Sequence, residues 1–148
     1  MRAIVQRVTR ASVAIGGAMH AEIGRGLVVL VGVGPDDTAD DVAWLAGRIS
    51  RLRIFADEAG KMNRSLLDLH GDVLAISQFT LFAEIAGNRP SFTGAAKPEL
   101  ARPLYQDFCN ALATILGRPV ATGIFAADMQ VSLVNDGPVT IALDSRQR

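Results

Sequence analysis

The sequence predicts a single α+β domain, in which a curled, mainly antiparallel and barrel-like β-sheet packs against two helices. The chain has 148 residues, 49% of them hydrophobic, which is enough to bury one substantial core. Short apolar segments of strand length recur along the whole chain, whereas only two segments have the spacing of an amphipathic helix. No linker, repeat or low-complexity stretch interrupts the pattern, so we expect residues 1–148 to form one domain.

The N-terminal part of the chain has the pattern of a hairpin followed by a buried strand. Residues 11–15 and 19–23 alternate between apolar and polar side chains, and Gly16-Gly17 lies between them. This is the signal of two antiparallel strands joined by a tight turn. Residues 27–33 are continuously apolar, which predicts a strand that is covered on both faces.

Two helices are predicted, over residues 38–51 and from about Pro98 to Gly117. Thr38 followed by Asp41 resembles a capping box, although Asp replaces the usual Glu. In the second helix Pro103 falls in the first turns, where a missing N–H costs least. Apolar residues recur at helical spacing in both segments: Val42, Leu45, Ile49 and Leu52, then Leu100, Leu104, Phe108, Leu112 and Ile115.

The remaining segments are predicted as strands and one long loop. Residues 83–97 contain Gly, Asn, Pro, Ser and Thr without any period. They indicate an ordered loop, which in a compact domain is usually functional. Strands are expected over residues 52–55, 73–82, 120–125, 129–134 and 139–143.

Composition excludes several classes of protein. Fifteen basic and fifteen acidic residues cancel, whereas a protein that coats nucleic acid non-specifically usually has a strong basic excess. Two His residues and one Cys are too few for a Cys/His zinc site, so we expect no metal. No P-loop or complete dinucleotide fingerprint is present, and we expect no cofactor.

The sequence has no signal peptide and no membrane-spanning run, which favours a cytoplasmic protein with no membrane partner. With a single Cys, we expect no internal disulfide.

The segment Ser77-Gln78-Phe79-Thr80 interrupts an otherwise apolar strand with three polar residues. Such an interruption indicates a place where the sheet faces a cleft, and successive backbone N–H groups there could bind a developing oxyanion. A half-exposed strand with ordinary outward polar residues explains the pattern equally simply. No Ser-His-Asp arrangement or pair of carboxylates is evident, so protein groups in an enzyme of this kind would mainly orient and polarise the substrate.

Two further segments leave alternatives open. Asn135-Asp136-Gly137 has the composition of a reverse turn, but Pro138 removes a donor where the next strand should begin pairing. The segment is therefore either a turn that contains Pro or a rigid loop that contacts a ligand. Residues 87–96 offer hydroxyl groups, one guanidinium group and small residues, which suit a ribose or phosphate but also an ordinary surface loop.

Five segments in order closely resemble the D-aminoacyl-tRNA deacylases, first described as D-tyrosyl-tRNA deacylases. The resemblance extends from Met1 to about Ser145. The matching segments are MRAIVQRV (1–8), KMNRSL (61–66), SQFTL (77–81), NRPSFTGA (88–95) and NDGPVT (135–140).

The resemblance implies a homodimer with tRNA as its partner and two active sites at the subunit interface. Ser77, Gln78, Phe79 and Thr80 would line the pocket of one subunit. The Gly137-Pro138 segment of the other subunit, with a cis peptide bond, would enter that pocket with its carbonyl groups towards the substrate α-amino group. Arg7 would help to fix the orientation of this segment.

The implied reaction is hydrolysis of the ester that joins a D-amino acid to the terminal adenosine of tRNA. Glycyl esters would also be accepted, because a rigid backbone wall excludes L side chains without selecting side-chain identity. The N–H groups of Phe79 and Thr80 resemble the oxyanion donors of the family. Thr80 has been regarded there as a nucleophile, but without a visible base the tRNA 2′-hydroxyl is the better assistant. Phe125 and Met129 would pack around the adenosine.

One departure and two alternatives accompany this interpretation. Many relatives carry a longer, more basic stretch where this chain has residues 83–86, so any tRNA contact of that loop does not carry over. The related class with a trans Gly-Pro bond admits some L-aminoacyl-tRNAs. A non-catalytic dimer that only binds aminoacyl-tRNA or a free D-amino acid is the alternative from a different class.

Overall fold

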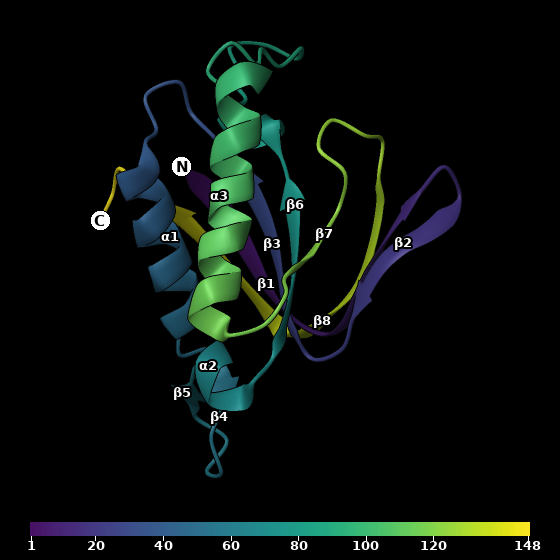
Figure 1. Ribbon diagram of the computed structural model, residues 1–148, viewed down its shortest axis with the longest axis vertical. Coiled ribbons are helices and arrows are strands. Elements are labelled where there is room, and N and C mark those ends of the chain that lie inside the picture. The colour runs from purple at the N-terminus through teal and green to yellow at the C-terminus, as the bar shows by residue number, and fades with distance from the viewer.

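A computed structural model describes all residues 1–148. A curled six-stranded sheet is covered on one face by two long helices that lie side by side, α1 (Ala39–Arg51) and α3 (Pro98–Leu116) (Figure 1). The six strands of this sheet are β1 (Arg2–Ile15), β2 (Ala18–Ile23), β3 (Gly26–Gly32), β6 (Asp72–Ser77), β7 (Ala121–Thr122) and β8 (Gln130–Asp144). A separate two-stranded ladder, β4 (Phe55–Ala56) and β5 (Met62–Arg64), lies at the opposite end of the molecule from the start of α3.

The sheet is mixed, with mainly antiparallel pairing, as predicted, and two parallel strand pairs that the sequence did not indicate. The long strand β1 pairs antiparallel with β2, β3 and β8, but β3 pairs parallel with β6, and β6 pairs parallel with β7. The parallel pairs arise because α1 lies between β3 and β6 in the chain, and α3 lies between β6 and β7. Each helix crosses over one face of the sheet and returns the chain in the same direction. The sheet curls until it is nearly closed.

The main hydrophobic core lies between the sheet and the two long helices. Leu45 and Ile49 of α1 and Phe108 and Leu112 of α3 are fully buried there. A smaller apolar cluster occupies the other side of the sheet, inside its curl, and includes Val8 of β1. The predicted burial of the third strand on both faces is confirmed, since all but one of its residues are buried.

The predicted first long helix is confirmed with its cap. The backbone N–H of Thr38 donates to Asp41 Oδ2 at 2.9 Å, and the helix continues to Arg51. The chain contains a third helix, α2 (Leu66–Leu69), so the expectation of two helices was wrong. Its signal was present in the sequence, because Ser65 and Asp68 form the same capping arrangement three residues apart.

The strand predicted over residues 73–82 is too long. β6 ends at Ser77, and a 3₁₀ helix, η1 (Phe79–Phe82), follows. The backbone N–H of Gln78 still donates to Val31 O at 2.7 Å, but β3 ends one residue later and offers no further ladder. The chain then bends into the tight helix, in which Leu81 N donates to Gln78 O at 3.3 Å.

The two strands predicted near the C-terminus are one strand, β8, with an excursion in its middle. Gln6 pairs with Thr140, whereas Val8 pairs with Asn135. One residue of β1, Arg7, therefore lies opposite four residues of β8, and these four, residues 136–139, project from the ladder. We call residues 136–139 the Gly-Pro elbow.

The other predicted boundaries were approximate. The strands expected over residues 52–55 and 120–125 are reduced to the two-residue strands β4 and β7. The predicted loop over residues 83–97 contains no helix or strand, and one bridge between Glu84 and Ser91 closes its tip. None of the helices has the length and apolarity needed to cross a membrane.

Candidate active site

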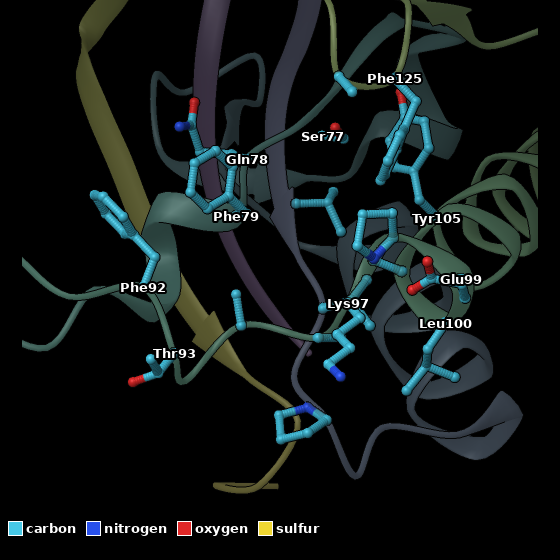
Figure 2. Close-up of a pocket in the computed structure, with 18 residues that line it drawn as sticks. Ser77, Gln78, Phe79, Phe92, Thr93, Lys97, Glu99, Leu100, Tyr105 and Phe125 are labelled. Carbon is cyan, nitrogen blue, oxygen red and sulfur yellow. The ribbon is translucent and has the colours of Figure 1, made fainter.

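A cavity of about 1060 Å³ opens beside the first turns of α3 (Figure 2). Its walls come from the end of β6, the start of η1, the loop that leads into α3, and the segment after β7. Eleven of the 18 lining residues are hydrophobic. A pocket of this size, mostly apolar with a few polar groups, is typical of a small-molecule site.

The polar groups at one end of the cavity come from the point where β6 gives way to η1. Ser77 and Gln78 line the cavity there, and the side-chain amide of Gln78 donates to Thr80 Oγ1. The first intrahelical bond of η1 is donated by Leu81. Phe79 and Thr80 come before Leu81 in the chain. Their N–H groups, like those of any first helical turn, have no partner within the helix.

Aromatic rings form two opposite walls of the cavity (Figure 2). On one side the rings of Phe79 and Phe92 meet edge to face, with centroids 5.1 Å apart. On the other side Tyr105 and Phe125 lie with centroids 6.1 Å apart. Tyr105 is fixed by a hydrogen bond from its hydroxyl to Ala75 O at 2.9 Å, and burial raises its pKa far above the usual value, so it stays protonated. The space between two such walls suits a flat aromatic ligand.

The predicted site residues are only partly brought together. Ser77, Gln78, Phe79 and Phe125 line the cavity, while Thr80 lies behind its edge and contacts Gln78. Met129 does not line the cavity. Its sulfur lies over Gly123, where a Cβ would be only 2.3 Å from it, and it packs with the smaller apolar cluster.

The three ionisable lining residues were not singled out from the sequence. Lys97 and Glu99 flank the start of α3, and Tyr105 lies two turns further along. The polar tip of Tyr105 on an apolar helix face was the only local signal for it. Lys97 and Glu99 gave none, because exposed charges at a helix start are common.

The tip of the Gly-Pro elbow, Gly137 and Pro138, is exposed, and the elbow is held at its base by polar contacts. Arg7 Nε donates to Asp136 O at 2.8 Å, and its Nη1 donates to Ile54 O. Asn135 accepts from the N–H of Val139 at 2.7 Å and donates to its carbonyl oxygen at 3.2 Å. The peptide bond between Gly137 and Pro138 is cis. The two termini of the elbow are therefore fixed while its tip faces solvent.

The elbow and the cavity lie towards opposite ends of the molecule. Arg7 joins the elbow to Ile54, which directly precedes β4 at the lower end of the molecule in Figure 1. The cavity lies at the start of α3, at the upper end of that view. Neither Gly137 nor Pro138 lines the cavity of the same chain.

At its Ser77-Gln78 end the cavity has no general base, because its one carboxylate, Glu99, lies near Lys97 at the start of α3 (Figure 2). Its lining contains no His, Cys or Asp, and Lys97, Glu99 and Tyr105 are the only titratable residues. No group of three or more His, Cys, Asp or Glu side chains is placed to hold a metal ion. What the site can supply is hydrogen-bond donors, aromatic surface and one cationic side chain.

The chain is similar to known proteins along nearly its whole length. Residues 4–144 match the family described as D-Tyr-tRNA(Tyr) deacylase. A D-aminoacyl-tRNA deacylase from Chlorobaculum tepidum is 58% identical over 100% of this chain and 99% of its own length. One from Deinococcus radiodurans is 59% identical over 97% of this chain and 99% of its own.

Two solved structures have the same fold. The c-Myc DNA unwinding element binding protein has a TM-score of 0.93 at 44% identity, covering 97% of this chain and 98% of its own. A probable eukaryotic D-amino acid tRNA deacylase has a TM-score of 0.83 at 18% identity, with 96% and 97% covered. At that identity the second match supports the fold alone.

Proposed function

The chain belongs to the D-Tyr-tRNA(Tyr) deacylase family, and from this premise we propose that it hydrolyses the ester bond of D-aminoacyl-tRNA, releasing free D-amino acid and tRNA. The observation that carries the proposal is a cavity with aromatic walls and free backbone donors at one end. It has room for a terminal adenosine with its amino acid. Because tRNA is charged in the cytoplasm, this is where the enzyme would act.

Catalysis assisted by the substrate is favoured because the one carboxylate of the cavity, Glu99, lies at the start of α3 and not beside Ser77 and Gln78. A water oxygen attacks the ester carbonyl carbon, and the bond to the ribose oxygen breaks. The N–H groups of Phe79 and Thr80 stabilise the negative charge that develops on the carbonyl oxygen. The neighbouring ribose 2′-hydroxyl orients the water and relays a proton. Thr80 is a poor nucleophile in this arrangement, because the side-chain contact of its hydroxyl is the Gln78 amide, which donates to it and cannot act as a base.

We further propose that the site is completed by a second copy of the chain. Neither Gly137 nor Pro138 lines the cavity of its own chain, so an elbow that enters a cavity would come from a partner. In a homodimer the carbonyl groups of Gly137 and Pro138 would hold the substrate α-ammonium group. An L side chain would then point into the elbow, whereas a D side chain would point away from it.

Such a gate would distinguish D- from L-amino acids without distinguishing one side chain from another. Pocket selection by size is worth only about 1–3 kcal/mol per methylene group, whereas a rigid backbone wall excludes every L side chain by overlap. Glycine has no side chain to exclude, so glycyl-tRNA would also be hydrolysed.

The decisive experiment is a deacylation assay with matched D-, L- and glycyl-tRNA. We expect loss of the D and glycyl esters and survival of the L ester. Loss of the L ester at a similar rate would contradict the gate, and binding of D-aminoacyl-tRNA without turnover would identify a non-catalytic binding protein.

Thr80→Val tests the catalytic role in the same assay, because it keeps the shape and the backbone N–H but removes the hydroxyl. Most activity should remain with this variant, whereas tRNA ending in 2′-deoxyadenosine should be a poor substrate. The reverse result would make Thr80 the nucleophile.

A further inference from the structure

Lys97 is the one lysine that lines the cavity, and it has no ion-pair partner. The sequence has only two lysines, Lys61 and Lys97. Lys97 is the N-cap residue of α3, directly before Pro98. None of the six ion pairs of the chain includes it. Its ammonium group therefore has no counter-ion at the exposed edge of the cavity.

Lys97 lies away from the end of the cavity where the reaction is proposed to occur. Figure 2 shows Ser77 and Gln78 at one end and the Lys97 ammonium group towards the other, with the aromatic walls of Phe79 and Phe125 to either side. A nucleoside whose ribose ester reaches the donors of Phe79 and Thr80 would lie between these walls. Its 5′ side would then point towards Lys97.

The surrounding charges favour an anion at this place. Glu99 is the only carboxylate that lines the cavity, and Arg102, one turn into α3, lies with its guanidinium carbon 4.9 Å from the centroid of the Phe125 ring. Neither Glu99 nor Arg102 takes part in an ion pair. Lys97, Glu99 and Arg102 are all exposed, and two cations with one anion leave a net positive charge at this edge of the cavity.

We propose that Lys97 binds the phosphate that links the terminal adenosine of the substrate to the preceding nucleotide, with Arg102 adding to the positive potential. This inference rests on the proposed function and adds a specificity determinant to it. The chain as a whole has no net charge, so it lacks a general attraction for RNA. A single phosphate contact at the cavity edge distinguishes a polynucleotide 3′ end from a free amino-acid ester or a nucleoside ester. A lysine suits this role as a mobile point charge for phosphate.

Binding of two simple probes tests the contact without any reaction. 5′-AMP carries the relevant phosphate and adenosine lacks it. Wild-type protein should bind AMP more tightly than adenosine by about tenfold, which corresponds to about 1.4 kcal/mol. Lys97→Met should reduce this ratio to near one, and Lys97→Arg should largely restore it. Lys61→Met is the matched control, because it removes the only other lysine, an exposed residue directly before β5. This variant should leave the ratio at the wild-type value.

Kinetics with two substrates provide the second measurement. The ratio of kcat/KM for D-aminoacyl-tRNA to that for a D-aminoacyl ester of adenosine should fall about tenfold in Lys97→Met, mainly through KM for the tRNA. The loss of one phosphate contact should also lower the slope of log affinity against log salt by about 0.7 for a single strand.

The outcomes separate this inference from the function on which it rests. If wild-type protein hydrolyses neither D-aminoacyl-tRNA nor the D-aminoacyl ester of adenosine, the proposed function is wrong. The phosphate contact is then wrong as well. If the wild type is active and Lys97→Met keeps the wild-type ratios in both experiments, the phosphate contact is wrong and the function stands. Equal loss on the tRNA and adenosine esters would also overturn the contact, because Lys97 would then act on the nucleoside or on the shape of the cavity.

Discussion

Arg7 and Asp136 are joined twice, although 128 residues separate them in the chain. Arg7 Nε donates to the backbone carbonyl of Asp136 at 2.8 Å and lies 3.4 Å from its carboxylate oxygen Oδ2. The same guanidinium group donates to Ile54 O, and its side chain is only 11% exposed. The start of the Gly-Pro elbow is thus tied to the strand on which Arg7 lies and to the chain before β4.

Arg7→Ala should weaken the proposed gate more than the fold. It leaves two carbonyl groups without a donor, at a cost of about 1–3 kcal/mol for each buried group that is left unsatisfied. We expect a lower D-over-L ratio in the deacylation assay and a modest drop in the unfolding midpoint. Arg7→Lys keeps the charge but offers a single donor point in place of a fork, so it should give an intermediate ratio. A wild-type ratio in Arg7→Ala would show that the elbow does not depend on this residue.

Gly137→Ala should disturb the elbow directly. Gly137 has a φ of +143°, a region that disfavours L residues, and an added Cβ would lie 2.8 Å from Val139 Cγ2 and 3.1 Å from Arg7 Nη2. The strain is about 1–3 kcal/mol, and we expect strongly reduced hydrolysis of D-aminoacyl-tRNA. Gly17→Ala is the control, because Gly17 also has a positive φ of +79° but faces open space in the first hairpin. If both variants retain full activity, the shape of the elbow is unimportant.

Asp37→Ala should destabilise the fold without altering the cavity. The Asp37 carboxylate lies 2.7 Å from the amino group of Met1, and the two groups are 2% and 0% exposed. It also accepts the N–H of Gly34 at 2.6 Å. Removal of one partner of a buried ion pair costs about 3–5 kcal/mol, which denaturant unfolding would detect. Asp36→Ala, at the exposed neighbouring position, should change the unfolding free energy by less than about 0.5 kcal/mol.

The stability of the protein should fall at acid pH, partly through Asp41. Burial alone would raise the pKa of Asp41, but hydrogen bonds from Thr38, Ser145 and Arg148 and the nearby N-terminal charge lower it well below its usual range. The folded chain therefore binds fewer protons than the unfolded chain. This contribution is complete above the ordinary Asp pKa of about 3.9 and is lost as pH falls towards the depressed value.

Unfolding free energies measured between pH 7 and pH 2 test this expectation. Asp41→Asn should be less stable at neutral pH and should show a shallower acid decline than the wild type. Asp40→Asn, at an exposed position in the same helical turn, should follow the wild-type curve. Parallel curves for the wild type and Asp41→Asn would contradict the assignment.

Local signals in the sequence were sufficient for the elements that local interactions form. The helix over residues 38–51 was predicted because its cap and its apolar spacing both lie within the segment. The same holds for the first hairpin and for the stop of α3 at Gly117, which has a φ of +69°. The family resemblance is confirmed by the comparisons.

Features that depend on distant parts of the chain could not be predicted from the sequence. The end of β6 depends on where its partner β3 runs out and on Gly32, where a Cβ would lie 2.9 Å from Gln78 O and would block the bend into η1. The parallel pairing of β6 follows from helices that cross the sheet, which no short window contains. The position of Met129 away from the cavity is decided by its packing over Gly123.

The roles of the site residues remain predictions, but the sequence did identify the region where they cluster. Ser77, Gln78 and Phe79 line the cavity because the polar interruption in the strand marks its real end. Lys97 enters only through tertiary placement, since nothing near it in the sequence distinguishes it from an ordinary surface lysine.

The separation of elbow and cavity within one chain has a consequence for mixtures of variants. A protein damaged in the elbow and another damaged in the cavity would each be inactive alone. After subunit exchange, each mixed pair would combine one intact elbow with one intact cavity and recover a single working centre. If the proposed dimer forms the active site, dilution that dissociates the dimer would also remove activity. The specific activity would then depend on the protein concentration.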